Sequence, residues 1–236
     1  MSLLRPRDFD ELLARTGLAL HVDADRTRIG PHGATDRKGR ALVLFFVQKP
    51  AGYAAVLERF SRLVNLVKPL GAEVAEPVVV HVLDDWLVFV EHASGEELCL
   101  RDWLLLRPAL ARRRAVAQRL REAISKVHAH RTFHGGLTAS HVLVGGGGEV
   151  VLTGLSLNAL VERDDARVEH AVDADRSALA ELLAALIGAE ANEWTDGAFS
   201  PPSLGATGTS TIETPVPSSV EKGPALLTHP WVPFPG

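Results

Sequence analysis

The sequence predicts an α+β protein in which a β-rich N-terminal half with one helix precedes a mainly helical half. The first observation is the apolar run Ala41–Val47, which has the length of a strand and carries β-branched and aromatic residues. The second is the long stretch Ala109–His130, in which apolar residues recur at helical spacing. No internal repeat interrupts this order.

The N-terminal half begins with a short predicted helix and then alternates strands with one longer helix. Its predicted elements are, in chain order, a helix over 8–15, a candidate strand over 18–22, a polar stretch with glycines over 23–40, a strand over 41–47, a helix over 53–70, and two strands over 77–81 and 86–90. Asp84-Asp85 marks the turn between the last two strands.

The C-terminal half is predicted to be helical around one small hairpin. Helices are expected over 98–106, 109–130 and 175–187, and Gly145–Gly148 is expected to form the turn of a hairpin between strands over 142–144 and 150–152. After Gly188 the composition changes, and residues 196–224 are rich in Gly, Pro, Ser and Thr without an apolar period. We predict a spacer without a core of its own for that segment.

Composition excludes several classes of function. The 236 residues carry a net charge of −4 with both signs well mixed, which gives no electrostatic signature of a nucleic-acid-binding protein. The basic run Arg112–Arg114 is interpreted as a solvated helix face. A single cysteine, Cys99, forms neither an internal disulfide nor a thiolate zinc cluster. The apolar runs are too short to cross a bilayer and the N-terminus is charged, so we expect no membrane contact and a cytoplasmic location.

Three segments resemble, in order and spacing, those of a bacterial Ser/Thr protein-kinase domain. VHAHRTFHGGLTASHVLV (127–144) is similar to the end of helix E and the catalytic loop, with His134 at the His of His-Arg-Asp. EVVLTGLSL (149–157) is similar to the strand that leads into Asp-Phe-Gly, and DRSALAELLAALIG (175–188) to helix F with its leading Asp. Leu226–Trp231 resembles the "L-L-x-H-P-W" with which many such domains end.

The N-terminal half resembles the small lobe of the same family. LERFSRLVNLVKPL (57–70) is similar to helix C, and LVFVEHASGEEL (87–98) to strand 5, the hinge and the start of helix D. The resemblance implies a two-lobed kinase-like fold, with a small antiparallel sheet plus helix C and a shortened, mainly helical C-lobe. The expected parts are an N-terminal helical extension (1–15), an N-lobe (16–94), a C-lobe core (95–190), a flexible segment (191–224) and a C-terminal segment packed on the C-lobe (225–236).

The residues that phosphoryl transfer requires are missing from this frame. Kinases use a strand lysine paired with a helix-C glutamate, an aspartate as base, and an asparagine and an aspartate as Mg²⁺ ligands. The resemblance implies that these positions are occupied, in that order, by Phe46, Leu63, Gly136, His141 and Thr153. Lys49 would replace Phe46 only in a shifted register. Since losing one stabilising donor already costs about 3–4 kcal/mol of transition-state stabilisation, we predict no enzymatic activity, no cofactor and no bound metal.

The leading hypothesis is therefore a catalytically inactive pseudokinase that acts as a protein-binding scaffold or regulator. We expect a protein partner, either an active kinase or a phosphothreonine-binding protein, and no tight ATP binding, because Phe46 would fill the nucleotide pocket. Within 191–224, Thr211 and Thr214 are candidate phosphoacceptors. The alternatives are a non-catalytic small-molecule or nucleotide sensor that uses the kinase cleft, and a different nucleotide transferase, which would need acidic metal ligands.

Other features admit a plainer interpretation. His128, His130, His134 and His141 suggest a zinc cluster, but their spacing matches no finger pattern. Gly145–Gly148 lacks the Gly-Lys-Ser/Thr of a phosphate-binding loop. Glu91, Glu96 and Glu97 could form an acidic pair, although a solvated turn is the favoured interpretation.

Overall fold

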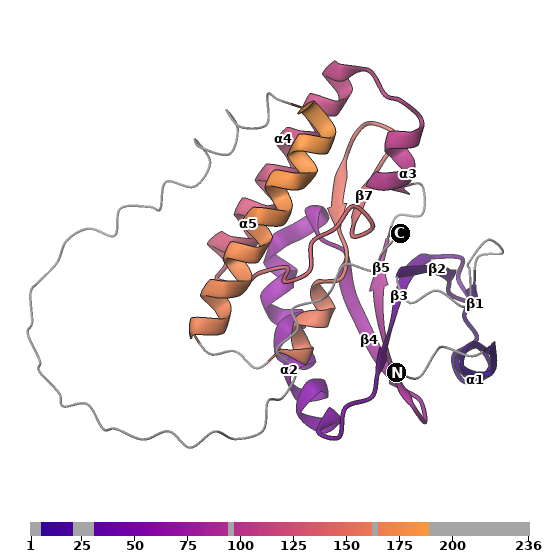
Figure 1. The fold of residues 1–236 in the computed structure, drawn as a ribbon. Helices are drawn as coiled ribbons and strands as arrows, with labels where there is room; N and C mark the ends of the chain where they lie inside the picture. The colour runs from indigo at the N-terminus through magenta and orange to yellow at the C-terminus, as the bar shows by residue number, and fades with distance from the viewer. Residues whose placement is uncertain (1–5, 21–30, 94–96, 162–164, 189–236) are drawn as a thin grey trace, which may run out of the picture.

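The computed structural model describes residues 6–20, 31–93, 97–161 and 165–188 (Figure 1). Its N-terminal part contains α1 (Pro6–Thr16), β1 (Ala19–Leu20), β2 (Pro31–Thr35), β3 (Ala41–Gln48), α2 (Tyr53–Val67), the 3₁₀ helix η1 (Lys68–Glu73), β4 (Glu76–Val82) and β5 (Trp86–His92). Its C-terminal part contains β6 (Leu98–Cys99), α3 (Leu100–Leu105), α4 (Leu110–Ala129), β7 (Val142–Val144), β8 (Val150–Leu152), the 3₁₀ helix η2 (Leu155–Leu160) and α5 (Asp165–Ile187). The α+β class is confirmed.

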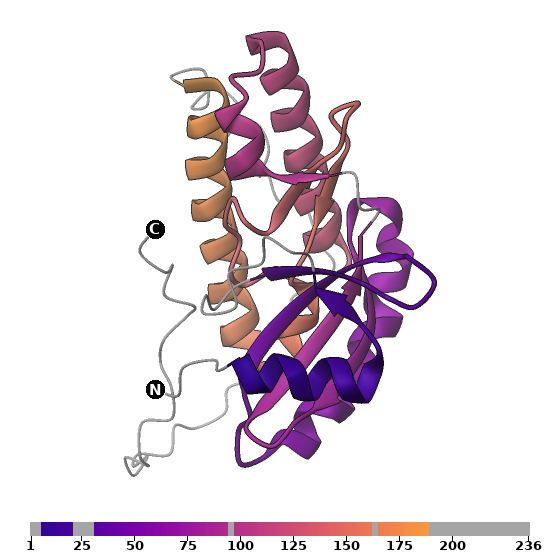
Figure 2. The same ribbon diagram turned by 90° about the vertical axis from the view of Figure 1, so that its right-hand side faces the viewer.

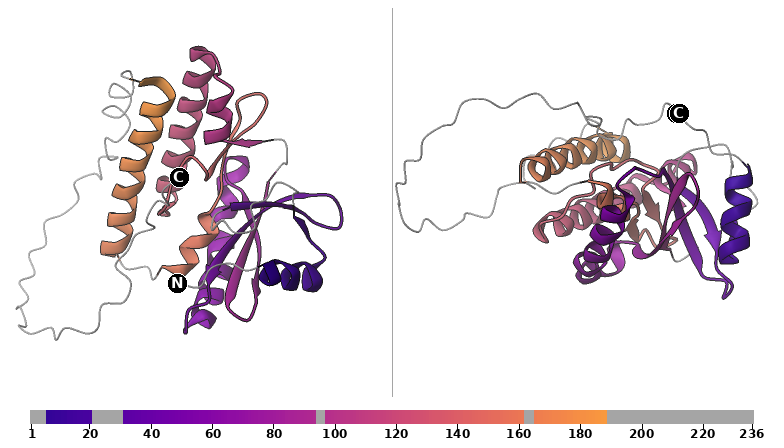
Figure 3. Two further views of the ribbon diagram at one scale, coloured as in Figure 1. Left: turned by 45° about the vertical axis from the view of Figure 1, so that its right-hand side comes forward. Right: turned by 90° about the horizontal axis from the view of Figure 1, so that it is seen from below.

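A five-stranded sheet in the order β1-β2-β3-β5-β4 forms the N-terminal part, and every neighbouring pair is antiparallel. Helix α1 covers one face of this sheet and α2 the other (Figures 2 and 3). Successive strand residues point to opposite faces, so β3 supplies both cores. Leu42, Leu44 and Phe46 pack with Phe9 and Leu12 of α1. Val43 and Phe45 pack with Val56 and Phe60 of α2.

The C-terminal part is built on α4 and α5, which run side by side (Figure 1). The apolar stripe of α4 (Val116, Leu120, Ile124, Val127) is buried with Leu179, Leu183 and Leu186 of α5. A three-stranded sheet in the order β6-β7-β8 lies against this pair and adds Val142, Val144 and Leu152 to the same core. Among the described residues, no helix combines the length and the apolar character that a membrane crossing needs.

Most predicted elements are present, and three differ. The stretch 23–40 was predicted to be polar and irregular, but Pro31–Thr35 forms β2, because pairing with β3 buries its alternate residues His32 and Ala34. The helix predicted over 98–106 begins at Leu100, since Leu98 and Cys99 pair with β7. The helix predicted over 175–187 begins ten residues earlier, at Asp165, so that Asp175 lies inside α5 and does not lead it.

Candidate functional site

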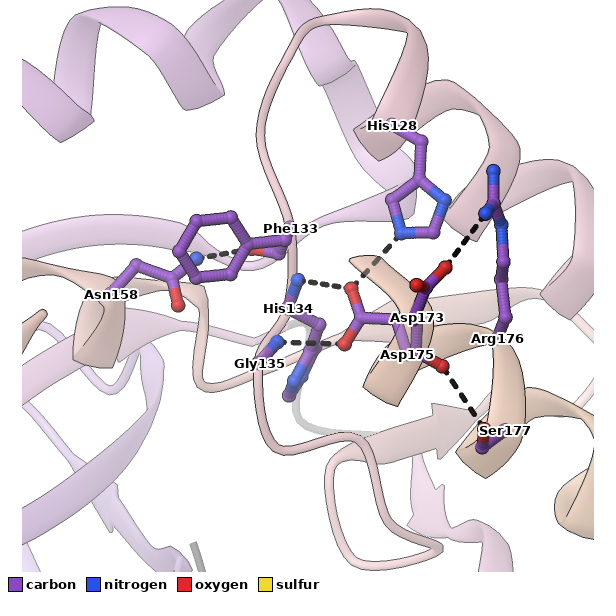
Figure 4. A network of polar contacts seen from close by, with 9 residues as sticks. All are labelled: His128, Phe133, His134, Gly135, Asn158, Asp173, Asp175, Arg176 and Ser177. Atoms are coloured by element: carbon purple, nitrogen blue, oxygen red, sulfur yellow. Dashed lines mark hydrogen bonds and ion pairs between the residues drawn. The ribbon is translucent and has the colours of Figure 1, made fainter. Parts of the chain in front are cut away.

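The loop after α4 is held by one carboxylate from α5. Asp175 has no exposed surface, and its Oδ2 accepts the backbone N–H of His134 at 2.6 Å while its Oδ1 accepts that of Gly135 at 2.7 Å (Figure 4). The Nε2 atom of His128, in the last turn of α4, lies 3.0 Å from the same Oδ2. A buried carboxylate is retained where several donors replace its water. Asp175 therefore fixes the path of residues 133–136 between the two long helices.

His134 links this loop to the residue that follows β8. Its Nε2 lies 2.7 Å from the carbonyl oxygen of Thr153, which can only accept, so Nε2 holds the proton. Burial lowers the pKa of His134, although the nearby Asp175 carboxylate and the Thr153 carbonyl act in the opposite direction. The ring is therefore neutral at pH 7 and acts as a structural link between the loop and β8.

His141 and Thr153, which the resemblance aligns with the metal-binding residues of a kinase, meet, and neither offers a carboxylate. The backbone N–H of Thr153 donates to the His141 carbonyl at 2.8 Å, and the Thr153 side chain is fully buried beside it. Burial, followed by the neighbouring His134, lowers the pKa of His141 to about 3. Gly136 also contacts His141. Since Mg²⁺ prefers oxygen ligands, chiefly carboxylates, this donor set does not suit it.

Phe46 and its neighbour Phe45 on β3 lie on opposite faces of the sheet. Phe46 packs against Phe9 of α1, with ring centroids 4.7 Å apart, on the face of the sheet away from α2. Phe45 faces the loop instead, and its ring centroid lies 5.8 Å from that of His141. The strand alternates between faces, so a one-residue error in register exchanges them. Phe46 therefore does not fill a pocket on the loop side of the sheet, and Phe45 is the β3 residue that contacts His141.

Lys49 does not restore a cation at this position. Its Nζ donates to the Leu83 carbonyl at 2.9 Å and lies over the Tyr53 ring, beyond the end of β3. On α2, Leu63 is buried in the core of the C-terminal part, whereas Phe60 packs with Phe45. The Phe60 ring contacts that of Phe89 on β5, with centroids 6.0 Å apart.

A buried glutamate joins β5 to the start of η2. Glu91 is fully buried; its Oε2 accepts the N–H of Gly154 at 2.7 Å, and its Oε1 accepts the N–H of Ser156 at 2.9 Å. Burial raises the pKa of Glu91 to about 7 against these hydrogen bonds. Our interpretation of Glu91 as part of a solvated turn is wrong. The signal that could have located it is its position directly after the apolar run Trp86–Val90, in a strand buried on both faces.

Helix η2 is fixed at its other end as well. The Asn158 side-chain amide donates to the Phe133 carbonyl (Figure 4), and Arg59 Nε donates to the Ala159 carbonyl at 2.7 Å. Gly154, the residue just before η2, has φ of +90°, and a Cβ there would lie 3.3 Å from His141 and 3.6 Å from Phe45. The space between β3, the loop and η2 is therefore filled by side chains.

The remaining predicted features are distributed as follows. Among the described residues, no group of three or more His, Cys, Asp or Glu side chains could hold a metal ion. His130, on the surface, contacts the Lys126 carbonyl and not the other histidines. The turn at Gly145–Gly148 is confirmed, with Gly145 N–H donating to Glu149 and Gly148 N–H donating back to Gly145. Glu96, Thr211, Thr214 and the 226–231 motif lie outside the described residues.

Comparison with known proteins adds no family assignment. No protein-family model matches the chain, and no curated protein matches it.

Proposed function

We propose that this chain is a pseudokinase: a two-lobed, protein-kinase-like domain without phosphotransfer chemistry that binds another protein as a scaffold or regulator. Support comes from the contact of Asp175 with the N–H groups of His134 and Gly135. The resemblance pairs that aspartate with helix F and that histidine with the catalytic loop. His134 and Gly135 lie 41 and 40 positions before Asp175 in sequence, and these hydrogen bonds bring the two segments together.

The side chains around the end of β8 support the proposal that the domain is catalytically inactive. Phe45, Gly136, His141 and Thr153 stand around the end of β8, where a kinase needs charge to hold phosphates and metal. The two buried carboxylates that bind the neighbouring backbone, Glu91 and Asp175, both have their oxygens engaged by N–H groups. Preorganised charge is the main source of phosphoryl-transfer catalysis, and these side chains supply none.

The sensor alternative is less well supported than the scaffold. The hollow beside η2, lined by Arg59, Arg62, Leu63, Leu66, Asn158 and Ala159, has a volume of about 220 Å³. Pockets for drug-sized ligands occupy roughly 300–1,000 Å³. Two side chains of that lining are also committed to holding η2 in place, Arg59 and Asn158.

A nucleotide-binding and phosphotransfer experiment tests the inactive assignment. The full chain would be heated with ATP or ADP, with and without Mg²⁺, because a bound nucleotide stabilises the fold in proportion to its affinity. We expect no rise in melting temperature and no transfer of labelled phosphate to the chain or to a generic protein substrate. A Mg²⁺-dependent transfer that His141→Ala abolishes would contradict the proposal.

Partner binding requires a second experiment. The tagged chain, purified from its native cell after cross-linking, should retain a stoichiometric protein, which we expect to be an active kinase or a phosphothreonine-binding protein. Exposure to that kinase, followed by mass spectrometry, should find phosphate on Thr211 or Thr214. A chain that elutes as an unaccompanied monomer under these conditions would contradict the scaffold.

A further inference from the structure

The turn between α3 and α4 exposes apolar side chains at one end of the molecule. In Figure 1 this connection lies at the top of the molecule, well above α1. Leu105 is 76% exposed and Leu106 67%, whereas Trp103 and Leu100 of the same helix are buried. Leu110, at the start of α4, is 38% exposed. These leucines are in contact with water in the free chain, which is unfavourable unless another surface covers them.

A hollow with two arginines lies next to these leucines. Leu104, Arg107, Pro108 and Arg113 line it, and its volume is about 330 Å³. The Nε atom of Arg113 is buried and has no hydrogen-bond partner among the described residues. A buried guanidinium N–H without an acceptor is unfavourable.

Arg107 occupies a backbone conformation that favours glycine. Its φ is +51°, and its N–H closes the C-terminal turn of α3 on the Leu104 carbonyl at 3.0 Å. Glycine is the usual residue at such a helix end, and a side chain there is unfavourable. Arg107 therefore lines the hollow in spite of its unfavourable backbone conformation.

The other arginines nearby are engaged elsewhere. Arg112 lies over the Trp103 ring and donates to the Gly146 carbonyl, and Arg119 donates to the Gly147 carbonyl at 2.9 Å. Arg101 pairs with Asp102 at 3.1 Å. Arg107 and Arg113 are the two arginines that line the hollow, beside the leucines.

We propose that this surface, defined by Leu105, Leu106, Arg107, Leu110 and Arg113, docks an acidic segment of a partner protein that also carries apolar side chains. A carboxylate would enter the hollow and accept from Arg107 and Arg113, and apolar side chains would cover the leucines. Charge-assisted pairs of this kind supply orientation, and the apolar contacts supply area. A concave site for one acidic group fits a peptide better than a flat anionic membrane. The proposal rests on the protein-binding function proposed above.

The test uses an array of short peptides with randomised sequence, probed with the labelled full chain. We expect the bound peptides to be enriched in Asp or Glu together with Leu or Phe, and one of them is then titrated by fluorescence anisotropy. Arg107→Gly removes the guanidinium and suits the backbone, and we expect it to weaken binding about tenfold or more without lowering the melting temperature. Leu106→Ser should weaken it too.

Arg131→Gly is the matched control. Arg131 also has positive φ, at +52°, and follows the other end of α4, one helix length away from the hollow. It should leave peptide affinity unchanged. Equal losses for both variants, or binding without a preference for acidic residues, would overturn the proposal. So would binding to phosphatidylserine vesicles without peptide binding, or self-association that Leu106→Ser removes. Peptide binding that Arg107→Gly spares would refute this surface yet leave the scaffold function intact.

Discussion

Glu91 and Gly154 lie 63 positions apart in sequence, and the N–H of Gly154 donates to the Glu91 carboxylate at 2.7 Å in a fully buried contact. With the second hydrogen bond from Ser156, this contact joins the five-stranded sheet to the segment that follows β8. The two N–H donors favour the charged form of this carboxyl group, whereas its removal from water disfavours that form. It therefore couples the stability of the protein to pH.

The unfolding free energy of the wild-type protein should fall relative to that of Glu91→Gln as the pH rises from about 5 to 8. The pKa of Glu91 is raised from 4.5 to about 7, so the folded state binds its proton more tightly than the unfolded state. The Glu91 contribution is complete below pH 4.5 and is lost as the pH rises through 7, in total on the order of 3 kcal/mol. Urea unfolding of both proteins at several pH values measures this difference. A constant difference would contradict the buried, raised carboxyl.

The two buried histidines should act in the opposite direction. The pKa of His141 is lowered from 6.5 to about 3, so the unfolded state takes up the proton first as the pH falls. Below pH 6.5, stability should therefore drop relative to His141→Asn by up to about 1.4 kcal/mol per pH unit, until the pH nears 3. The same unfolding series measures it. Parallel curves for the two proteins would show that His141 is protonated equally in both states.

Replacing Gly154 by alanine should destabilise the protein by about 1–3 kcal/mol, because its φ of +90° is unfavourable for other residues. Gly39 has φ of +76° with open space around the missing Cβ, and Gly146 has open space without positive φ. Gly39→Ala therefore measures backbone strain alone, and Gly146→Ala should change little. If Gly154→Ala cost no more than Gly146→Ala, the packing around η2 would differ from that described.

Asp175→Asn should cost about 3 kcal/mol or more of unfolding free energy. An asparagine oxygen can serve one of the two backbone N–H donors, but its NH₂ group would face the other, and the charge that stabilises both is lost. Asp173→Asn is the control, since the Asp173 side chain is 70% exposed and pairs with Arg176 on the surface of the same helix. Exposed pairs contribute about 0–1 kcal/mol. Urea midpoints of the two variants should separate clearly.

The sequence was sufficient where a local pattern determines the structure. The helical stripe of α4, the glycine turn after Val144 and the paired strands around Asp84-Asp85 all follow from short-range periodicity and turn chemistry. Strand β2 escaped prediction because only its pairing with β3 makes the polar sequence PHGAT extended. The register of β3 escaped it too, since Phe45 and Phe46 are equally apolar and only tertiary packing decides which one faces α2.

The site was predicted in part for the same reason. The meeting of His141 with Thr153 follows from two neighbouring strands and their loop, which the sequence places together. The burial of Glu91 could not be predicted in this way. Its carboxylate is stabilised by N–H groups that are distant in sequence, and no local pattern identifies them.

Helix α1 has a practical consequence for where the folding unit begins. Phe9 and Leu12 are completely buried against β3 and its neighbours, and the Phe9 ring contacts both His32 and Phe46. Expression from residue 16, the boundary that separated the N-terminal extension from the sheet, would uncover an apolar sheet face. Such faces lead to aggregation. The minimal soluble fragment should therefore include α1, which is part of the folding unit and not an appendage.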